Sequence, residues 1–227
     1  LPVPIAPQLR PRLEAALGSP GPLLFPRRDG SMHPSKLRLG RVLRALYGGR
    51  RLLAEGLLPP EVVYGHPGFL RTCDQIRLPG PHQLFLAAAD LARDADGRHV
   101  VLSDRTQAPS GVGYALENRV VVSRVLPGLH RSAQVQRLAP FFRALRSSLH
   151  QVAPSTDDTP RIVVLTPGQW SETAFEHGYL AAQLGVPLVQ GADLRVRDGR
   201  VWMRSIGRLE PVHVIVRRVD AAFCDPV

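Results

Sequence analysis

The sequence predicts a mixed fold of the α/β (α+β) class. Antiparallel β-hairpins and helices come first along the chain, and a βαβ unit follows them. Two apolar runs, 84–91 and 99–103, flank a polar turn that contains Asp96-Gly97, a dipeptide typical of tight hairpins. Further along, residues 161–189 change from an apolar run to a helical pattern and back to an apolar run. That order is typical of buried parallel strands joined by a crossover helix.

The composition is that of a globular protein, because 44% of its 227 residues are apolar and 21% are charged. The sequence has neither a run of roughly 18 apolar residues nor a signal-peptide pattern at its start, so we expect no membrane. A cytoplasmic location, with Cys73 and Cys224 reduced, is the default. The net charge of +10 is spread along the chain as arginines, and Lys36 is the single lysine. Small anionic ligands are therefore favoured over nucleic acid.

Three segments are expected along the chain. Residues 1–36, rich in Pro, Gly and Arg, are predicted to be irregular. Residues 37–153 begin with helical spacing, continue through the hairpin, and end in an amphipathic helix between Val135 and Leu149. A Pro-, Ser- and Asp-rich linker then leads to residues 160–227, with the βαβ unit, a hairpin and a further strand. Because no closing element follows that strand, we expect the chain to be a fragment of a longer protein.

The stretch from Asp104 to Arg119 is the first candidate for a site. A strand leads into it, a second apolar run at 120–122 follows it, and residues 109–113 form a turn with two glycines and a hydroxyl. Glycines allow backbone amides to approach a ligand closely, and successive amides form an anion-binding concavity. The alternative is an ordinary loop between two strands.

Two carboxylates are the second candidate. Asp90 lies on one arm of the predicted hairpin and Asp104 just beyond the other. A hairpin can bring two such side chains to one hard cation, since these cations select oxygen ligands. The alternative is a pair of exposed acids near a turn. His66, in a His-Pro-Gly turn, is expected to cap that turn rather than bind a ligand.

The run from Asp104 to Arg119 resembles the signature of the circularly permuted ATP-grasp type 2 family, which is similar to glutathionylspermidine synthetase-like ligases. The resemblance covers residues 37–227, and residues 1–36 match poorly. Further matching motifs occur in the family's order: Leu46-Tyr47-Gly48, Gly56-Leu57-Leu58-Pro59-Pro60, His66-Pro67, Phe69-Leu70-Arg71, Leu165-Thr166-Pro167-Gly168, Phe175-Glu176-His177, Gly191-Ala192-Asp193-Leu194, Arg217-Arg218-Val219-Asp220 and Phe223-Cys224-Asp225-Pro226.

The resemblance implies an ATP-dependent carboxylate–amine ligase that uses ATP and Mg²⁺ and passes through an acyl phosphate. Its substrates would be a small-molecule or peptide carboxylate and an amine. The resemblance also implies ATP-grasp-type hairpins followed by the start of a Rossmann-like domain. The nucleotide-gripping half is expected downstream of residue 227, so this chain alone is expected to be inactive.

The chain departs from the family's metal-binding pattern. That pattern has an Asp, matched here by Asp90, and a Glu-x-Asn 13 residues later, where this chain has Ser103 and Arg105. Arg105 brings a positive charge where a cation should bind, or it holds a phosphate or carboxylate directly. Asp104 is shifted by one residue and is expected on the opposite face unless the strand bulges. The alternative function is therefore a catalytically degenerate ATP-grasp scaffold that binds a peptide or a protein partner.

Roles follow from these observations together. Asp90 and Asp104 are the predicted metal ligands. Arg105 and Arg119 are the predicted catalytic residues, which hold anionic groups. The predicted substrate-binding residues are Ser110, Gly111, Gly113, Glu117 and Asn118. Glu176 and His177 are expected to serve helix packing.

Overall fold

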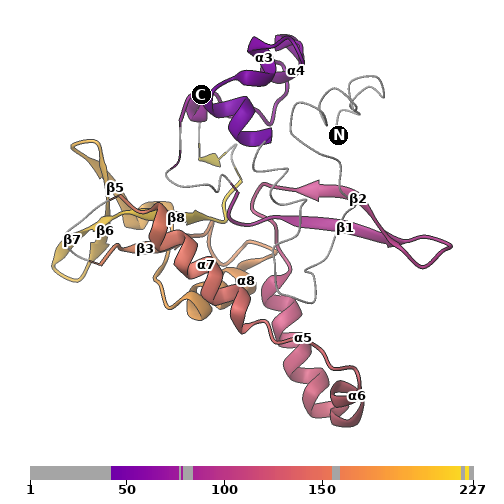
Figure 1. Ribbon diagram of the computed structural model, residues 1–227. Coiled ribbons are helices and arrows are strands. Elements are labelled where there is room, and N and C mark those ends of the chain that lie inside the picture. The colour runs from indigo at the N-terminus through magenta and orange to yellow at the C-terminus, as the bar shows by residue number, and fades with distance from the viewer. Residues whose placement is uncertain (1–41, 77, 79–83, 155–158, 221–222, 225–227) are drawn as a thin grey trace. The chain divides into compact units, whose positions relative to one another are not determined.

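The computed structural model describes residues 42–76, 78, 84–154, 159–220 and 223–224 (Figure 1). Its contacts divide the chain into two compact units, Leu1–Arg105 and Thr106–Val227, and each is described by itself. Both helices and strands are present, as the sequence predicts. The predicted irregular segment 1–36 lies outside the described residues, and the predicted domain boundaries stay predictions. None of the helices in the described ranges has the length and hydropathy needed to cross a bilayer.

Four short helical elements come first among the described residues of the first unit. Leu52 and Val63 are buried between them, and Phe69 stacks on Tyr47 with ring centroids 4.8 Å apart. The side chains of Arg50 and Asp74 form an ion pair that ties the ends of this region together. His66 caps its turn as predicted, because its Nδ1 accepts a hydrogen bond from the Gly68 amide at 3.0 Å. The four elements are η1 (Arg44–Gly48), α3 (Arg51–Ala54), α4 (Pro60–Tyr64) and η2 (Arg71–Cys73).

The predicted hairpin follows in the same unit. Strand β1 (Ala88–Arg93) pairs antiparallel with β2 (His99–Arg105), and the Asp94 side chain caps the turn by accepting from the Arg98 amide at 2.7 Å. Asp90 lies opposite Ser103, which follows it by 13 residues in the chain. The register shifts after Asp90 and leaves Leu102 as the extra residue of a bulge.

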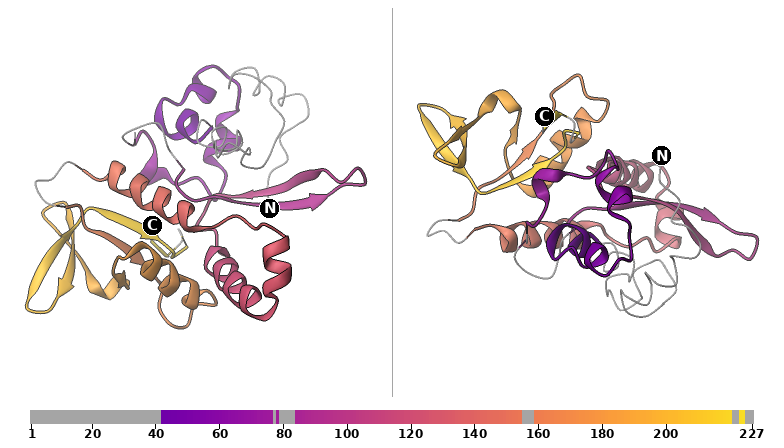
Figure 2. Two further views of the ribbon diagram at one scale, coloured as in Figure 1. Left: turned by 60° about the horizontal axis from the view of Figure 1, so that its bottom comes forward. Right: turned by 90° about the horizontal axis from the view of Figure 1, so that it is seen from above.

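The second unit begins with three helices. The left view of Figure 2 shows α6 folding back beside the end of α5. The apolar run 120–122 lies within α5, so the alternative of an ordinary loop between two strands is wrong. Helix α7 buries Phe142, Leu145 and Leu149, the apolar face that the sequence predicts. The three helices are α5 (Val112–Val125), α6 (Pro127–Ser132) and α7 (Ala139–Val152).

The predicted βαβ unit forms the centre of the second unit. Strand β3 (Ile162–Leu165) lies between β4 (Leu188–Val189) and β8 (Val214–Arg217), and both pair with it in parallel. Helix α8 (Ala174–Leu184) connects β3 to β4 and packs against α7 (Figure 1). Gly185 ends α8 in the left-handed conformation, φ 67°, that glycine adopts without strain.

A three-stranded antiparallel sheet connects β4 to β8. After η3 (Gly191–Asp193) come β5 (Leu194–Arg197), β6 (Arg200–Ser205) and β7 (Arg208–Val212), paired in that order. The sequence predicts the first two of these strands but not β7, because Pro211 weakens the strand pattern there. Met203 of β6 packs with Val163 and Val189 and joins this sheet to the parallel one.

Candidate functional site

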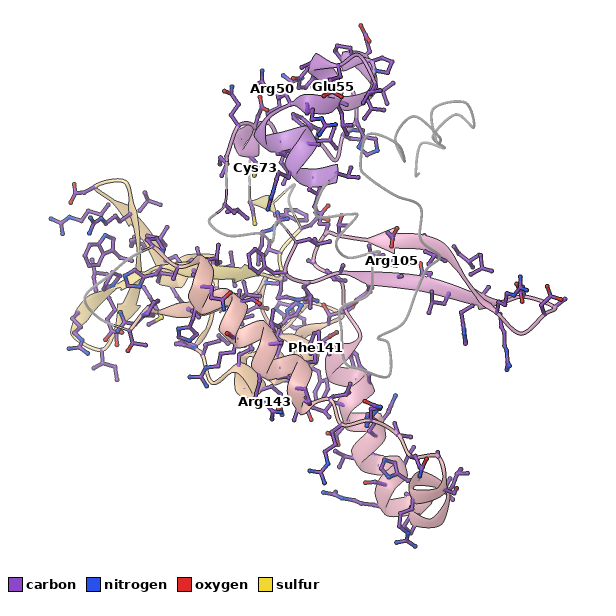
Figure 3. All side chains as sticks on the ribbon, viewed as in Figure 1. Arg50, Glu55, Cys73, Arg105, Phe141 and Arg143 are labelled. Atoms are coloured by element: carbon purple, nitrogen blue, oxygen red, sulfur yellow. The ribbon has the colours of Figure 1, made fainter. Side chains whose placement is uncertain are left out.

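Three polar side chains gather on one face of the β1–β2 hairpin. Ser103 Oγ donates to Asp90 Oδ2 at 2.5 Å, and Arg105 donates to the same oxygen from Nε at 3.1 Å and from Nη2 at 3.0 Å. The Ser103 hydrogen bond and then the Arg105 guanidinium hold the pKa of the Asp90 carboxyl below its usual range. Arg105, labelled in Figure 3, keeps 65% of its side chain exposed and Asp90 keeps 47%.

Asp104 lies on the other face of the hairpin. It pairs with Ala89, the neighbour of Asp90, so the two carboxylates point to opposite faces. The bulge at Leu102 does not change this, because Asp104 and Asp90 lie on the same side of it. Partial burial raises the pKa of the Asp104 carboxyl. Within the described ranges, no cluster of three or more His, Cys, Asp or Glu side chains is arranged to hold a metal ion.

The glycine turn places its amides at the start of α5, and these amides hold a carboxylate. The Gly111 amide lies 2.7 Å from both carboxylate oxygens of Glu176, and the Gly113 amide donates to Oε1 at 3.2 Å. Glu176 is on α8 and is only 1% exposed. The first amides of a helix lack partners within the helix and favour negative charge. The predicted anion-binding concavity therefore exists, and the protein's own Glu176 fills it.

The geometry explains both glycines. Gly111 has φ +119°, a backbone conformation that strains any residue with a side chain. A Cβ on Gly113 would lie 3.0 Å from Glu176 Cγ. Both positions therefore allow the carboxylate and the backbone to approach each other closely.

The other predicted site residues between Asp104 and Arg119 do not share one environment. Ser110 and Asn118 are exposed. Burial, followed by the negative charge of nearby Glu117, raises the pKa of the Tyr179 phenol on α8. Arg119 Nη2 donates to the carbonyl oxygen of Gln136. Glu117 and Arg119 thus join α5 to two different neighbours within the second unit.

Glu176 belongs to a cluster of four buried polar side chains in the second unit. The cluster consists of Thr166, Glu176, His177 and Arg218, each at most 6% exposed. His177 is bonded at both ring nitrogens, Nδ1 to Thr166 Oγ1 at 2.8 Å and Nε2 to Thr173 Oγ1 at 2.9 Å. Burial, followed by the charge of Arg218, lowers the pKa of His177, which favours a neutral imidazole at pH 7. Glu176 opposes this shift.

Arg218 is the unusual member of this cluster. Its backbone amide continues the β8 pairing by donating to the Leu165 carbonyl at 2.8 Å. Its side-chain Nε and Nη1 are buried, and no described residue accepts a hydrogen bond from them. Burial lowers the pKa of the guanidinium, and the nearby Glu176 charge opposes that shift. A buried cation with unused donors is costly unless an anion completes it.

The cluster lies where parallel sheets commonly bind ligands. Thr166 follows β3 directly, and Arg218 follows the adjacent strand β8. In the loop after β3, Gly168 donates to Thr166 Oγ1 at 3.1 Å and has φ +108°. Open α/β sheets bind ligands beyond the carboxyl ends of their strands. The unused donors of Arg218 at this edge of the sheet suit an oxyanion, which would accept hydrogen bonds from them.

The comparison with known families agrees with the order of motifs on these elements. Residues 37–227 match the circularly permuted ATP-grasp type 2 family. The chain belongs to this family. An uncharacterized protein of Mycobacterium tuberculosis strain H37Rv is 50% identical over 198 residues, which cover 87% of this chain and 22% of that protein. An uncharacterized protein of Synechocystis is 38% identical over 184 residues, which cover 81% of this chain and 38% of that protein.

A further uncharacterized Mycobacterium tuberculosis protein is 38% identical over 182 residues, which are 80% of this chain and 33% of that protein. This ATP-grasp chain therefore spans between 22% and 38% of the length of the curated relatives it matches. The activity, substrates and partners of the whole protein are proposals.

Sequence reasoning missed Thr166, His177 and Arg218 as members of a site in this ATP-grasp chain. Each lies in a matching motif, but the motif alone does not say that the side chain is buried. A usable signal was present: Thr166 directly follows one apolar run expected to be a buried strand, and Arg218 follows another such run after Arg217. When two parallel strands are adjacent, the polar residues that follow each of them lie at the same edge of the sheet.

Proposed function

We propose that this ATP-grasp protein is an ATP-dependent carboxylate–amine ligase that forms peptide-type bonds, similar to glutathionylspermidine synthetases. The observation that carries the proposal is the family membership over residues 37–227. In this reaction a carboxylate oxygen takes the γ-phosphoryl group of ATP and releases ADP. The amine then attacks the acyl carbon, phosphate leaves, and the amine loses a proton. The parallel sheet would be the start of a Rossmann-like domain, and the protein would work in the cytoplasm.

The residues of the glycine turn have two kinds of role in this proposal. Ser110 and Asn118 are exposed side chains, available for direct contact with a substrate. The amides of Gly111 and Gly113 are held by Glu176, so they position the start of α5. Glu117, through Tyr179, fixes the orientation of the same helix.

The two predicted catalytic arginines differ in what already holds them. Arg119 donates to a carbonyl oxygen, which leaves its positive charge without a paired anion in that contact. Arg105 already binds Asp90. A substrate oxyanion at Arg105 would therefore have to compete with that carboxylate, whereas no carboxylate among the described residues forms an ion pair with Arg119.

The hairpin does not fit Mg²⁺ in its present arrangement. Asp90 accepts from Ser103 and Arg105 through one oxygen, so a guanidinium lies where a divalent cation would need that oxygen. Asp104, the second proposed ligand, lies on the other face. We therefore assign no step to a metal on this hairpin. The family's use of ATP and Mg²⁺ is a proposal for the protein in its natural full length.

Ligase activity is tested by trapping. The protein in its natural full length is incubated with ATP, Mg²⁺, a panel of amino-acid and peptide carboxylates, and hydroxylamine in place of the amine. We expect ADP release that depends on the carboxylate, and a hydroxamate in equal amount. Carboxylate-independent ADP release, or none, across the panel would contradict the proposal.

The second candidate is a non-catalytic ATP-grasp scaffold that binds a peptide or a protein partner. The ion pair between Arg105 and Asp90 favours it, because the pair neutralises the carboxylate that matches the family's metal-binding pattern. Mg²⁺-dependent ATP binding by the full-length protein would favour the ligase, and no binding at millimolar ATP would favour the scaffold. The double variant Ser103→Glu/Arg105→Asn is expected to bind Mg²⁺ more tightly in calorimetry. Unchanged affinity would show that this hairpin is not the metal site.

A further inference from the structure

The inference begins with the unused donors of Arg218. This side chain is 6% exposed, and its Nε and Nη1 have no hydrogen-bond acceptor among the described residues. A guanidinium stays charged in proteins and presents its donors in a fixed plane. Burying it without acceptors is unfavourable by the full desolvation cost of the unpaired groups. The fold therefore keeps a cation in a place where only an added acceptor can satisfy it.

The neighbouring groups do not supply that acceptor. Glu176, whose negative charge acts on Arg218, uses its carboxylate on the amides of Gly111 and Gly113. His177 uses both ring nitrogens on the hydroxyl groups of Thr166 and Thr173. Each polar neighbour is therefore already bonded, and the charge of Glu176 acts on Arg218 only at a distance.

The position of Arg218 favours a ligand over a packing role. It follows β8 at the carboxyl edge of the parallel sheet, next to Thr166 at the same edge of β3. Loops at this edge carry the binding residues of open α/β sheets. The adjacent Arg217 pairs with Leu165 inside the strand, and successive side chains of a strand point to opposite faces. Of these two arginines, only Arg218 is buried.

We propose that Arg218 binds an oxyanion, a phosphate or a carboxylate, at the carboxyl ends of β3 and β8. The charge complements the guanidinium, and the oxygens accept from Nε and Nη1. Thr166 and His177 hold the floor of this site in place through their mutual hydrogen bond. If the proposed ligase function is correct, the oxyanion is either a phosphate of ATP or the carboxylate to be activated.

The competing explanation is that Arg218 only balances the buried charge of Glu176. The two explanations predict opposite signs for one substitution. A ligand-binding arginine whose donors are unpaired destabilises the ligand-free protein. Arg218→Met should therefore leave the melting temperature unchanged or raise it. An arginine that balances Glu176 stabilises the ligand-free protein, so the same substitution should lower the melting temperature.

The experiment measures thermal unfolding of the protein in its natural full length at one pH and one ionic strength. Sodium chloride is the reference, phosphate and pyrophosphate form one arm, and acetate and succinate form the other. At 100 times the dissociation constant, we expect the matching arm to raise the melting temperature by about 5–10 °C over chloride. The responding arm tells which of the two oxyanions the site prefers.

Arg218→Met should abolish that rise, and Arg217→Met, the matched control one residue earlier, should retain it. If Arg218→Met does not fold, Arg218→Lys replaces it. Lys keeps the charge but loses the planar donors, and calorimetry should show roughly tenfold weaker binding. No rise in either arm, a rise that survives Arg218→Met, or unchanged affinity in Arg218→Lys would each overturn the proposal.

These measurements are independent of catalysis. Oxyanion binding through Arg218 without trapped hydroxamate would reject the ligase and keep this site. Trapped hydroxamate without oxyanion binding through Arg218 would reject this site and keep the ligase.

Discussion

The two units each bring an aspartate or glutamate together with an arginine, but with different consequences. On the hairpin, Asp90 and Arg105 bond directly and both remain exposed. In the second unit, Glu176 and Arg218 are both buried, yet Glu176 bonds to backbone amides and Arg218 keeps unused donors. An exposed pair is screened by water, whereas each buried charge needs specific acceptors or donors. The buried region should therefore dominate both stability and ligand binding.

The largest expected effect comes from removing the buried carboxylate. Glu176→Ala leaves the amides of Gly111 and Gly113 without their acceptor and removes a negative charge that acts on Arg218. We expect the free energy of unfolding to fall by about 3 kcal/mol. Urea denaturation followed by circular dichroism measures it. The control is Glu172→Ala, at an exposed position before α8, which should change stability by less than about 0.5 kcal/mol. Equal losses from Glu176→Ala and Glu172→Ala would contradict the claim that the buried carboxylate contributes more to stability than an exposed one.

A second test enlarges the glycine that meets this carboxylate. Gly113→Ala places a methyl group 3.0 Å from Glu176 Cγ, so the side chain must shift. We expect a loss of about 1–2 kcal/mol in the free energy of unfolding. Gly178→Ala, within α8 where nothing lies within 4 Å, should instead gain about 0.5–1 kcal/mol. Two changes of the same sign would show that the approach of Glu176 does not limit residue 113.

A third test uses pH. The pKa of His177 is lowered in the folded protein, whereas an unfolded histidine titrates near 6.5. Below about pH 6.5 the unfolded chain therefore binds more protons at this position than the folded chain does. Stability should fall as the pH drops from there to the lower folded pKa. His177→Gln should reduce this dependence when urea midpoints are compared at pH 7.5 and below. An unchanged pH dependence would contradict burial of a neutral His177.

The smallest effects are expected on the hairpin. Ser103→Ala and Arg105→Gln should each raise the pKa of Asp90 toward its ordinary value. Ser103→Ala should have the larger effect, because its hydrogen bond is the leading cause of the lowered pKa. Carboxyl NMR titration measures both shifts. The stabilisation from this depressed pKa is present at neutral pH and is lost as the pH falls through the folded pKa. Each substitution should lower stability at neutral pH only slightly, because the pair is exposed and screened by water, and a large loss would contradict that exposure.

Local patterns were enough to predict the hairpin and the βαβ unit. The Asp-Gly turn between two apolar runs predicted the hairpin, and continuous apolar runs predicted β3 and β4. Residues 120–122 misled because three consecutive valines favour strands locally. Their helix begins at amides held by Glu176, which is 65 residues away from Gly111 in the sequence. A contact of that separation has no local signal.

The candidate site was predicted only in part for the same reason. The glycine turn presents amides to an anion, but that anion is a side chain of the protein, and the expected substrate contacts of the turn stay predictions. The burial of Arg218 depends on β3, α8 and β8 meeting at one edge, which no single motif encodes. The predicted metal ligands and catalytic residues stay predictions.

The most direct test of the central claim observes the amides that Glu176 holds. Proton–nitrogen NMR spectra of the wild-type protein and Glu176→Gln report on Gly111 and Gly113, with Arg105→Gln as the exposed counterpart. We predict downfield amide protons at both glycines, slow hydrogen exchange, a large upfield change in Glu176→Gln, and no change in Arg105→Gln. Glycine amides that exchange rapidly and do not respond to Glu176→Gln would contradict the claim that this buried carboxylate organises the site.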